Sequence, residues 1–255
     1  MDFKFIKDSL FNISFLRNFY QMGFYKMDMI YKIEDLNLHY YNLVKKLGDA
    51  EIEHQIGRLT NFKKIIEFIA HKKISGDIIE FGSWKGFSLH WMAYLIERQG
   101  IFDKKIVGVD SFEGLPSSEG PFTKGGFKNT SQKECRNNIL RSPYLYEATK
   151  RMIFIEKFLF SQKSKIVRKI KSLEIKKFCF IHIDSDLSTS FKQVIKILTE
   201  GGIIADHCFI LIDDYGTNQR LRIAVDTEMK KLQKKWKISL FSKTLLTRNF
   251  ELKRK

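Results

Sequence analysis

The chain of 255 residues, 44% of them apolar and 29% charged, is long enough to bury a full core as one large domain with extensions. Lysine and arginine outnumber aspartate and glutamate by 45 to 29, and the resulting net charge of +16 is compatible with nucleic acid, an anionic membrane surface or an anionic glycan. No known nucleic-acid-binding motif is present, and no apolar run approaches the ~18 residues of a membrane span, so we expect neither a nucleic-acid partner nor a transmembrane helix.

The cysteines and the N-terminus indicate a cytoplasmic protein. Cys135, Cys179 and Cys208 have neither metal-ligand spacing nor a paired framework, which suits a reducing compartment. Charged residues interrupt the apolar N-terminus, so no signal peptide is predicted.

Residues 1–30 are rich in aromatic side chains, and Phe11, Phe15 and Phe19 recur at helical spacing. This helix is expected to pack on the domain or on a partner subunit of a homo-oligomer. The alternative is a helix that lies on the inner membrane surface and makes a peripheral contact. Residues 34–73 are also predicted to be helical.

A glycine turn after residue 76 is the stretch around which the chain is organised. Residues 76–88 begin as an apolar run that ends in Glu80 and then pass through Gly82 and Gly86 into an amphipathic segment at residues 90–98. This order predicts a strand, a tight turn and a helix. Glycine lets a backbone approach a ligand closely, and amides at a helix start can face an anionic group. The spacing differs from that of dinucleotide binders, so an ordinary strand-to-helix turn is the alternative.

Strands and helices alternate along the remaining chain. Apolar runs predict strands at residues 105–110, 153–156, 178–184, 203–212, 236–241 and 243–252. Amphipathic segments predict helices at residues 191–199 and 221–232. The polar segment 117–150 is so long that we expect a lid. This order indicates an α/β fold with a mostly parallel sheet, covering helices and an antiparallel C-terminal edge strand.

Acidic residues follow several predicted strands. Asp110, Asp184 and the pair Asp213 and Asp214 each stand at a strand end. The carboxyl ends of parallel strands meet at one rim, where ligands bind, so we expect these acids to lie together with Glu80. Converging carboxylates repel one another unless a cation neutralises them, and oxygen ligands suit Mg²⁺. The alternative is that they cap helices or pair with lysines.

Together, these segments resemble the macrocin O-methyltransferase family of S-adenosylmethionine-dependent enzymes. The matching motifs are the glycine turn at residues 76–86, Val-Asp-Ser-Phe-Glu-Gly-Leu-Pro at 109–116, Ile-Asp-Ser-Asp-Leu at 183–187, Ile-Asp-Asp-Tyr-Gly at 212–216 and Arg-Ile-Ala-Val-Asp at 222–226. The resemblance covers residues 56–250.

The resemblance implies a Rossmann-like seven-stranded methyltransferase sheet in a domain at residues 56–255, preceded by a helical N-terminal extension at residues 1–55. It implies S-adenosylmethionine and Mg²⁺ as cofactors. The implied cofactor-binding residues are Glu80, Gly82, Ser83, Gly86, Asp110 and Ser111. The implied metal ligands are Asp184, Asp213 and Asp214.

The resemblance also implies methylation of a sugar hydroxyl on a glycan or a glycosylated metabolite. Two vicinal hydroxyls would bind the metal, and a base would take the proton of the one that attacks the methyl group. Candidates for the base are Asp186 and His207, with His182 as a third.

Other acceptors and one other function stay open. The net charge makes an anionic acceptor, such as an acidic polysaccharide, a reasonable hypothesis. A catechol-like hydroxyl is the alternative acceptor. The alternative function is a non-catalytic glycan- or membrane-associated binding protein with the same fold.

Overall fold

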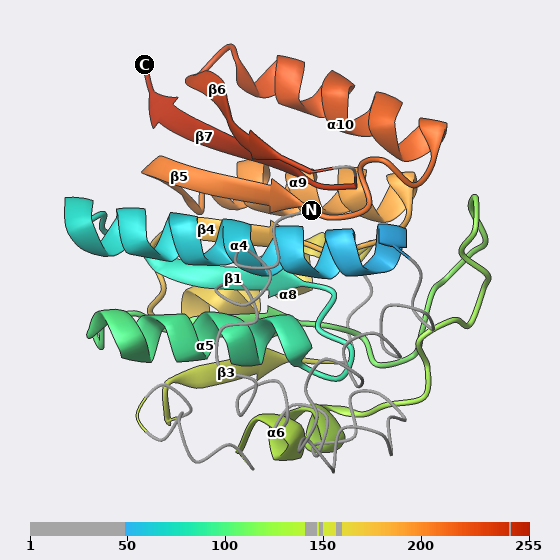
Figure 1. Cartoon of the computed structure of the whole chain (residues 1–255), viewed down its shortest axis with the longest axis horizontal. Helices are drawn as coiled ribbons and strands as arrows, with labels where there is room; N and C mark the ends of the chain where they lie inside the picture. The colour runs from blue at the N-terminus through green and yellow to red at the C-terminus, as the bar shows by residue number, and fades with distance from the viewer. Residues whose placement is uncertain (1–48, 141–146, 148–149, 157–159, 245) are drawn as a thin grey trace.

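The computed structural model describes residues 49–140, 147, 150–156, 160–244 and 246–255. Its strands form one seven-stranded sheet in the order β3-β2-β1-β4-β5-β7-β6 (Figure 1). Their bounds are β1 (Asp77–Phe81), β2 (Ile106–Val109), β3 (Met152–Ile155), β4 (Phe178–Ile183), β5 (Ile204–Ile212), β6 (Trp236–Lys243) and β7 (Arg248–Arg254). Strands β1 to β5 pair in parallel, whereas β7 pairs antiparallel with both β5 and β6. The predicted methyltransferase sheet is confirmed, with the antiparallel strand one position inside the edge strand β6.

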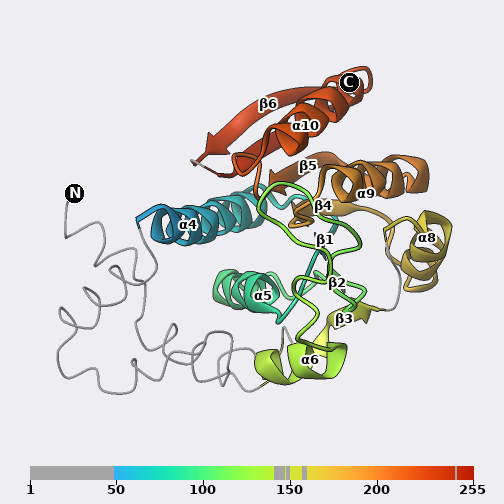
Figure 2. The same cartoon turned by 90° about the vertical axis from the view of Figure 1, so that its right-hand side faces the viewer.

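Helices cover both faces of the sheet (Figure 2). Helices α4 (Asp49–Lys72) and α5 (Phe87–Gln99) lie on one face, and α8 (Lys163–Ser172), α9 (Ser188–Gly201) and α10 (Gln219–Leu232) lie on the other. The short helix α6 (Gln132–Leu140) packs near the start of α5. Because both faces are covered, every residue of β4 is buried.

Helix α4 crosses the predicted domain boundary between residues 55 and 56 without a break. Its side chains Ile65, Ile66 and Ile69 are fully buried, as expected for the helix before the glycine turn. The predicted aromatic helix in residues 1–30 lies outside the described residues. Within the described part of the chain, no helix is both long enough and apolar enough to span a membrane.

Strand β5 contains an irregularity that sets where its end lies. Phe178 of β4 is opposite Ile204, but Phe180 is already opposite Phe209, so β5 holds extra residues between the two pairs. The register is regular again from Phe209 to Ile212, which pairs with Ile183. The residues that follow these two strands therefore emerge at the same level of the sheet.

Candidate active site

A cavity of about 700 Å³ lies at the carboxyl ends of the parallel strands. It is bounded by the glycine turn, by helix α4 and by the segment at residues 111–131, which we call the rim loop. Figure 2 looks onto this end of the sheet, with the rim loop in front of the strands. The position matches the general rule that ligands of open α/β sheets bind beyond the strand carboxyl ends.

The glycine turn is held against the next strand by Asp110. One oxygen of its carboxylate accepts hydrogen bonds from the backbone N–H groups of Ser83 and Trp84, both at 2.8 Å, and the other accepts from Phe112 N–H at 2.7 Å. Gly82 has a φ of +93°, and a Cβ there would overlap the carbonyl oxygen of Asp184. Only glycine fits this conformation and this approach of two chain segments.

Four of the six predicted cofactor residues line the cavity, namely Gly82, Ser83, Asp110 and Ser111. The other two lie behind it. Glu80 is fully buried, with its Oε1 2.8 Å from His182 Nδ1. Gly86 begins α5 with a φ of +88° and faces Cys135 and Ile139 of α6. These two residues support the turn from behind, and the structure does not bring them to the cavity surface.

Four aspartates converge on the cavity: Asp184, Asp186, Asp213 and Asp214. Ligand atoms of Asp184, Asp186 and Asp214 all lie within 4.8 Å of one another, and so do those of His182, Asp184 and Asp213. The three predicted metal ligands are thus divided between two overlapping groups that share Asp184. The structure adds Asp186 to the acids that could hold a cation.

The protein shifts the pKa values of these acids in different directions. Burial raises the pKa values of Asp184, Asp186 and Asp214 well above the ordinary carboxyl range, and neighbouring aspartates raise them further. Burial also opposes ionisation of Asp213, but the Arg58 guanidinium, then His54 and His182, lower its pKa below the ordinary value. Asp213 is therefore the carboxylate that the protein itself keeps charged.

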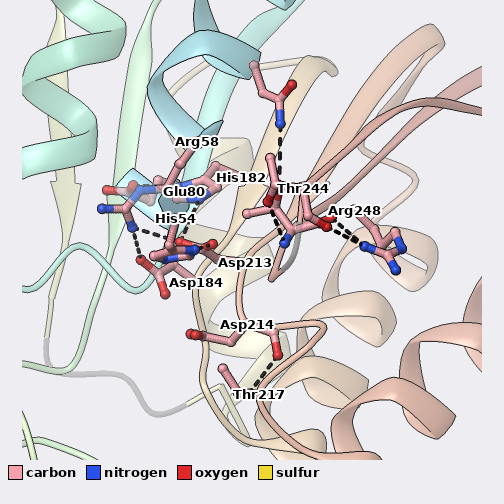
Figure 3. A network of polar contacts seen from close by, with 12 residues as sticks. His54, Arg58, Glu80, His182, Asp184, Asp213, Asp214, Thr217, Thr244 and Arg248 are labelled. Carbon is pink, nitrogen blue, oxygen red and sulfur yellow. Dashed lines mark hydrogen bonds and ion pairs between the residues drawn. The ribbon is translucent and has the colours of Figure 1, made fainter. Parts of the chain in front are cut away.

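Two residues of this site were not foreseen from the sequence, and both come from α4. Arg58 Nη1 donates to Asp213 Oδ2 at 2.7 Å and to Asp184 Oδ2 at 3.1 Å (Figure 3). His54 Nε2 lies 3.4 Å from Asp213 Oδ1. The aspartates stand 126 and 155 positions from Arg58 along the chain, so no local sequence pattern could have paired them.

The structure separates the three candidates for the catalytic base. Asp186 lines the cavity, with a carboxyl oxygen within 4.8 Å of one of Asp214. His207 is not among the residues that line it: it lies in the middle of β5, pairs with Lys253 of β7 and has Nε2 2.8 Å from Glu251 Oε1. His182 is fully buried between Glu80 and the ring of Phe62. His207 and His182 are thereby removed from the candidates, because neither side chain reaches the cavity.

The rim loop is tied to the start of α9 by Glu119. Its carboxylate accepts hydrogen bonds from Ser188 N–H at 2.9 Å and from Ser188 Oγ–H at 2.6 Å. The acceptor at the start of this helix thus comes from the rim loop and not from the polar residues next to the helix, because the N-cap residue Leu187 makes no side-chain cap. The loop also carries Phe127, whose ring packs edge-on against Trp84 of the glycine turn at 5.5 Å. The lid was expected at residues 117–150. In the structure, the segment that borders the cavity is the rim loop at residues 111–131.

A model of the macrocin O-methyltransferase (TylF) family matches residues 54–239. The chain belongs to this family. The resemblance predicted from the motifs is confirmed, and so is the prediction that the chain is an S-adenosylmethionine-dependent O-methyltransferase by family. The matched region starts at His54, on the same helix as Arg58.

Individual relatives agree with this family. Demethyldecarbamoylnovobiocin O-methyltransferase from Streptomyces niveus is 30% identical over 61 residues, which cover 24% of this chain and 23% of that protein. The match therefore spans about a quarter of the relative's length. The structure of the O-methyltransferase NovP aligns with a TM-score of 0.64 at 20% identity, covering 78% of this chain and 81% of that one. The calicheamicin methyltransferase CalS11 aligns with a TM-score of 0.63 at 15% identity, covering 92% and 91%. At these identities the structural likeness shows the shared fold.

The residues present fit both groups that the family implies. Gly82 and Ser83 of the glycine turn line the cavity, and the buried hydroxyl of Ser83 makes no hydrogen bond to the described residues. In the acid cluster, Asp213 Oδ1 is buried and accepts no hydrogen bond within the same residues, with His54 Nε2 3.4 Å away. Hard oxygen atoms that lie close together and lack donors are suited to a divalent cation.

Proposed function

We propose that this chain transfers a methyl group from S-adenosylmethionine to a sugar hydroxyl, with help from a divalent cation. The observation that carries the proposal is that the glycine turn and the acid cluster open into one cavity of about 700 Å³. A volume of this size is typical of sites for small molecules and cofactors. The cavity can bring a methyl donor and an acceptor together next to a carboxylate base.

The protein's side chains divide the work between binding and proton transfer. Gly82, Ser83, Asp110 and Ser111 would hold S-adenosylmethionine, which when bound supplies an electrophilic methyl group. Asp184, Asp213 and Asp214 would hold a divalent cation, which when bound lowers the pKa of a coordinated hydroxyl.

Asp186 is the residue that we assign to proton transfer. It lines the cavity beside the acid cluster, so it can accept a proton from an acceptor hydroxyl held there. Burial raises its pKa well above the ordinary carboxyl value, which makes it a better proton acceptor than an exposed aspartate once it is ionised. A carboxyl oxygen of Asp186 lies within 4.8 Å of carboxyl oxygens of Asp184 and Asp214, so the base is next to the proposed cation site.

A sugar acceptor is supported by what the relatives act on. One solved relative with a TM-score of 0.56 is named a TDP-rhamnose 3'-O-methyltransferase of calicheamicin biosynthesis. Another relative is named for its action on demethyldecarbamoylnovobiocin. The cavity chemistry agrees, because adjacent hydroxyls of a sugar can share one cation held by carboxylates.

The test is methyl transfer from deuterium-labelled S-adenosylmethionine to a panel of acceptors, followed by mass spectrometry. The panel contains TDP-rhamnose, a neutral rhamnoside, an acidic polysaccharide fragment and catechol. We expect labelled sugar products in the presence of Mg²⁺ and their loss in a chelator. Labelled catechol without any labelled sugar would contradict the sugar assignment, and undiminished transfer in the chelator would contradict the cation.

A further inference from the structure

The active-site cavity has a charge balance opposite to that of the whole protein. The chain contains 45 lysine and arginine residues, yet Arg58 is the only one among the described residues that line the cavity. Five aspartates line the same cavity: Asp110, Asp184, Asp186, Asp213 and Asp214. A single fixed cation therefore faces the whole acid cluster.

Arg58 is placed to serve two of these acids at once. The same nitrogen, Nη1, donates to Oδ2 of Asp213 at 2.7 Å and to Oδ2 of Asp184 at 3.1 Å. Figure 3 shows the side chain reaching from α4 to these two carboxylates. The side chains of Arg58 and Asp213 are buried, with relative exposures of 8% and 1%, so water screens their attraction little.

The contacts of Arg58 leave part of each carboxylate for another ligand. Both hydrogen bonds use Oδ2, and Asp213 Oδ1 accepts none from the described residues. The arrangement fixes the two carboxylates from the α4 side. The other oxygen of Asp213 faces His54, whose Nε2 lies 3.4 Å away, and receives no contact from Arg58.

Helix α4 holds Arg58 firmly in this position. Gly57 lies directly against Thr244 of the β6–β7 connection, where a side chain would clash. Asn61 accepts a hydrogen bond from Ser242 Oγ at 2.7 Å, and Trp91 of α5 donates from Nε1 to the carbonyl oxygen of Leu59 at 3.1 Å. These contacts lie on both sides of Arg58 in the sequence, so the guanidinium is presented by a helix fixed to the rest of the fold.

We propose that Arg58 is a positioning residue that acts as the resident counter-cation of the acid cluster. It holds Asp184 and Asp213 in place when no divalent cation is present and leaves their outer oxygens for one to bind. This inference rests on the proposed divalent cation site. It adds that the site is already assembled by the protein, so wild type needs the metal for reaction and not for keeping its fold.

The test is thermal unfolding of the full chain in chelator and in Mg²⁺. In chelator, Arg58→Gln should unfold about 10 °C below wild type, because it leaves the buried Asp213 carboxylate without its counter-charge. Mg²⁺ should recover most of that loss, and it should raise the midpoint of wild type much less. Recovery by Mg²⁺ is the signature of a charge role, because a loss of packing alone would not respond to a divalent cation.

Three further variants complete the experiment. Lys64→Gln removes the same charge from an exposed position on α4 and should match wild type in both conditions. Arg58→Lys keeps the positive charge without the guanidinium, so Mg²⁺ should raise its unfolding midpoint less than that of Arg58→Gln. Arg58→Lys can also replace Arg58→Gln in the comparison with wild type if Arg58→Gln does not fold. The double variant Arg58→Gln, Asp213→Asn removes both partners and should regain stability in chelator relative to Arg58→Gln.

Failure of this inference and failure of the proposed function look different. If Arg58→Gln loses as much stability in Mg²⁺ as in chelator, or loses none, Arg58 is not a counter-cation, even if wild type still needs Mg²⁺ for methyl transfer. If Mg²⁺ changes neither the stability of any variant nor the transfer reaction, the cation site itself is refuted, and the role of Arg58 with it.

Discussion

At the scale of single residues, Asp186 and Asp214 adopt an unusual backbone conformation. Each has a φ of 56°, in the left-handed region that costs a non-glycine residue about 1 kcal/mol or more. Both residues line the cavity, where a carboxyl oxygen of one lies within 4.8 Å of a carboxyl oxygen of the other. Strain of this kind persists where the surrounding structure requires it, and here it lies at the acids on which the proposed reaction depends.

Asp186→Asn tests the assignment of the base. The amide has nearly the shape of the carboxylate but cannot accept the proton of the acceptor hydroxyl, so kcat should fall by about 100- to 10,000-fold. The affinity for S-adenosylhomocysteine should stay close to that of wild type. Asp206→Asn is the matched control, because Asp206 is exposed on β5 and pairs with Lys177, and it should leave both quantities unchanged. Wild-type turnover by Asp186→Asn would show that another group takes the proton.

The raised pKa values of Asp184, Asp186 and Asp214 predict how the metal-free protein responds to pH. Between the unfolded carboxyl pKa of about 4 and the higher folded values, the folded state binds more protons than the unfolded state. Stability in chelator should therefore fall as the pH rises through this window, and unfolding in urea at a series of pH values measures it. Asp186→Asn should flatten the decrease. A rise in stability over the same window would mean that these acids are already ionised in the fold.

The sequence predicted that acids at strand ends would lie together, but it did not predict which residues contact them. Asp184, Asp213 and Asp214 follow apolar runs, and parallel pairing alone brings them together. Arg58 looks like any polar residue of an amphipathic helix, and its role depends on how α4 packs. His207 was misassigned because the long run at residues 203–212 gave no sign that the extra residues form an irregularity in mid-strand, far from the rim.

At the scale of elements, the alternation of apolar and amphipathic segments predicted the seven strands and four of the six helices of the described residues, whereas α6 and α8 were not predicted. The strands at residues 178–183 and 204–212 and the helix at residues 219–232 fall where the pattern placed them. Two features depended on tertiary contacts and were not predictable. The cap of α9 comes from Glu119 on a distant loop, and β7 inserts between β5 and β6.

Gly82→Ala tests the glycine turn. The new Cβ would overlap the carbonyl oxygen of Asp184 and would also sit at a φ of +93°, so the turn must move and binding of S-adenosylhomocysteine should be abolished. Gly202→Ala is the matched control: its φ is +65°, but nothing lies within 4 Å of the added Cβ. We expect this control to lose about 1 kcal/mol of stability and to keep its affinity for the cofactor product. Equal affinity in both variants would show that the turn is not at the cofactor site.

Glu119→Gln tests the connection between the rim loop and α9. The substitution weakens a charge-assisted cap, so the rim loop should detach more often, with a several-fold higher KM for the acceptor and faster cleavage of residues 111–131 by a protease. Glu113→Gln, an exposed residue of the same loop, provides the control and should behave as wild type. Unchanged cleavage in Glu119→Gln would show that other contacts hold the loop.

At the scale of the whole molecule, a strongly basic protein encloses an acidic site. The net charge of +16 can attract an anionic acceptor from a distance, while the acid cluster inside the cavity favours a cation. An anionic acceptor can satisfy both the basic surface and the acidic cavity if its anionic groups stay outside the cavity and its hydroxyls enter. The methyl-transfer site that we propose lies in the cavity at the carboxyl ends of β1, β2, β4 and β5.

Calorimetric titration of S-adenosylhomocysteine into wild type, followed by Mg²⁺ into the complex, tests this site most directly. We expect saturable binding of the cofactor product, then a heat of Mg²⁺ binding that is lost in Asp213→Asn while the cofactor product still binds. Absence of any binding by S-adenosylhomocysteine to folded wild type would contradict a working methyltransferase site and would favour a binding protein that keeps only the fold.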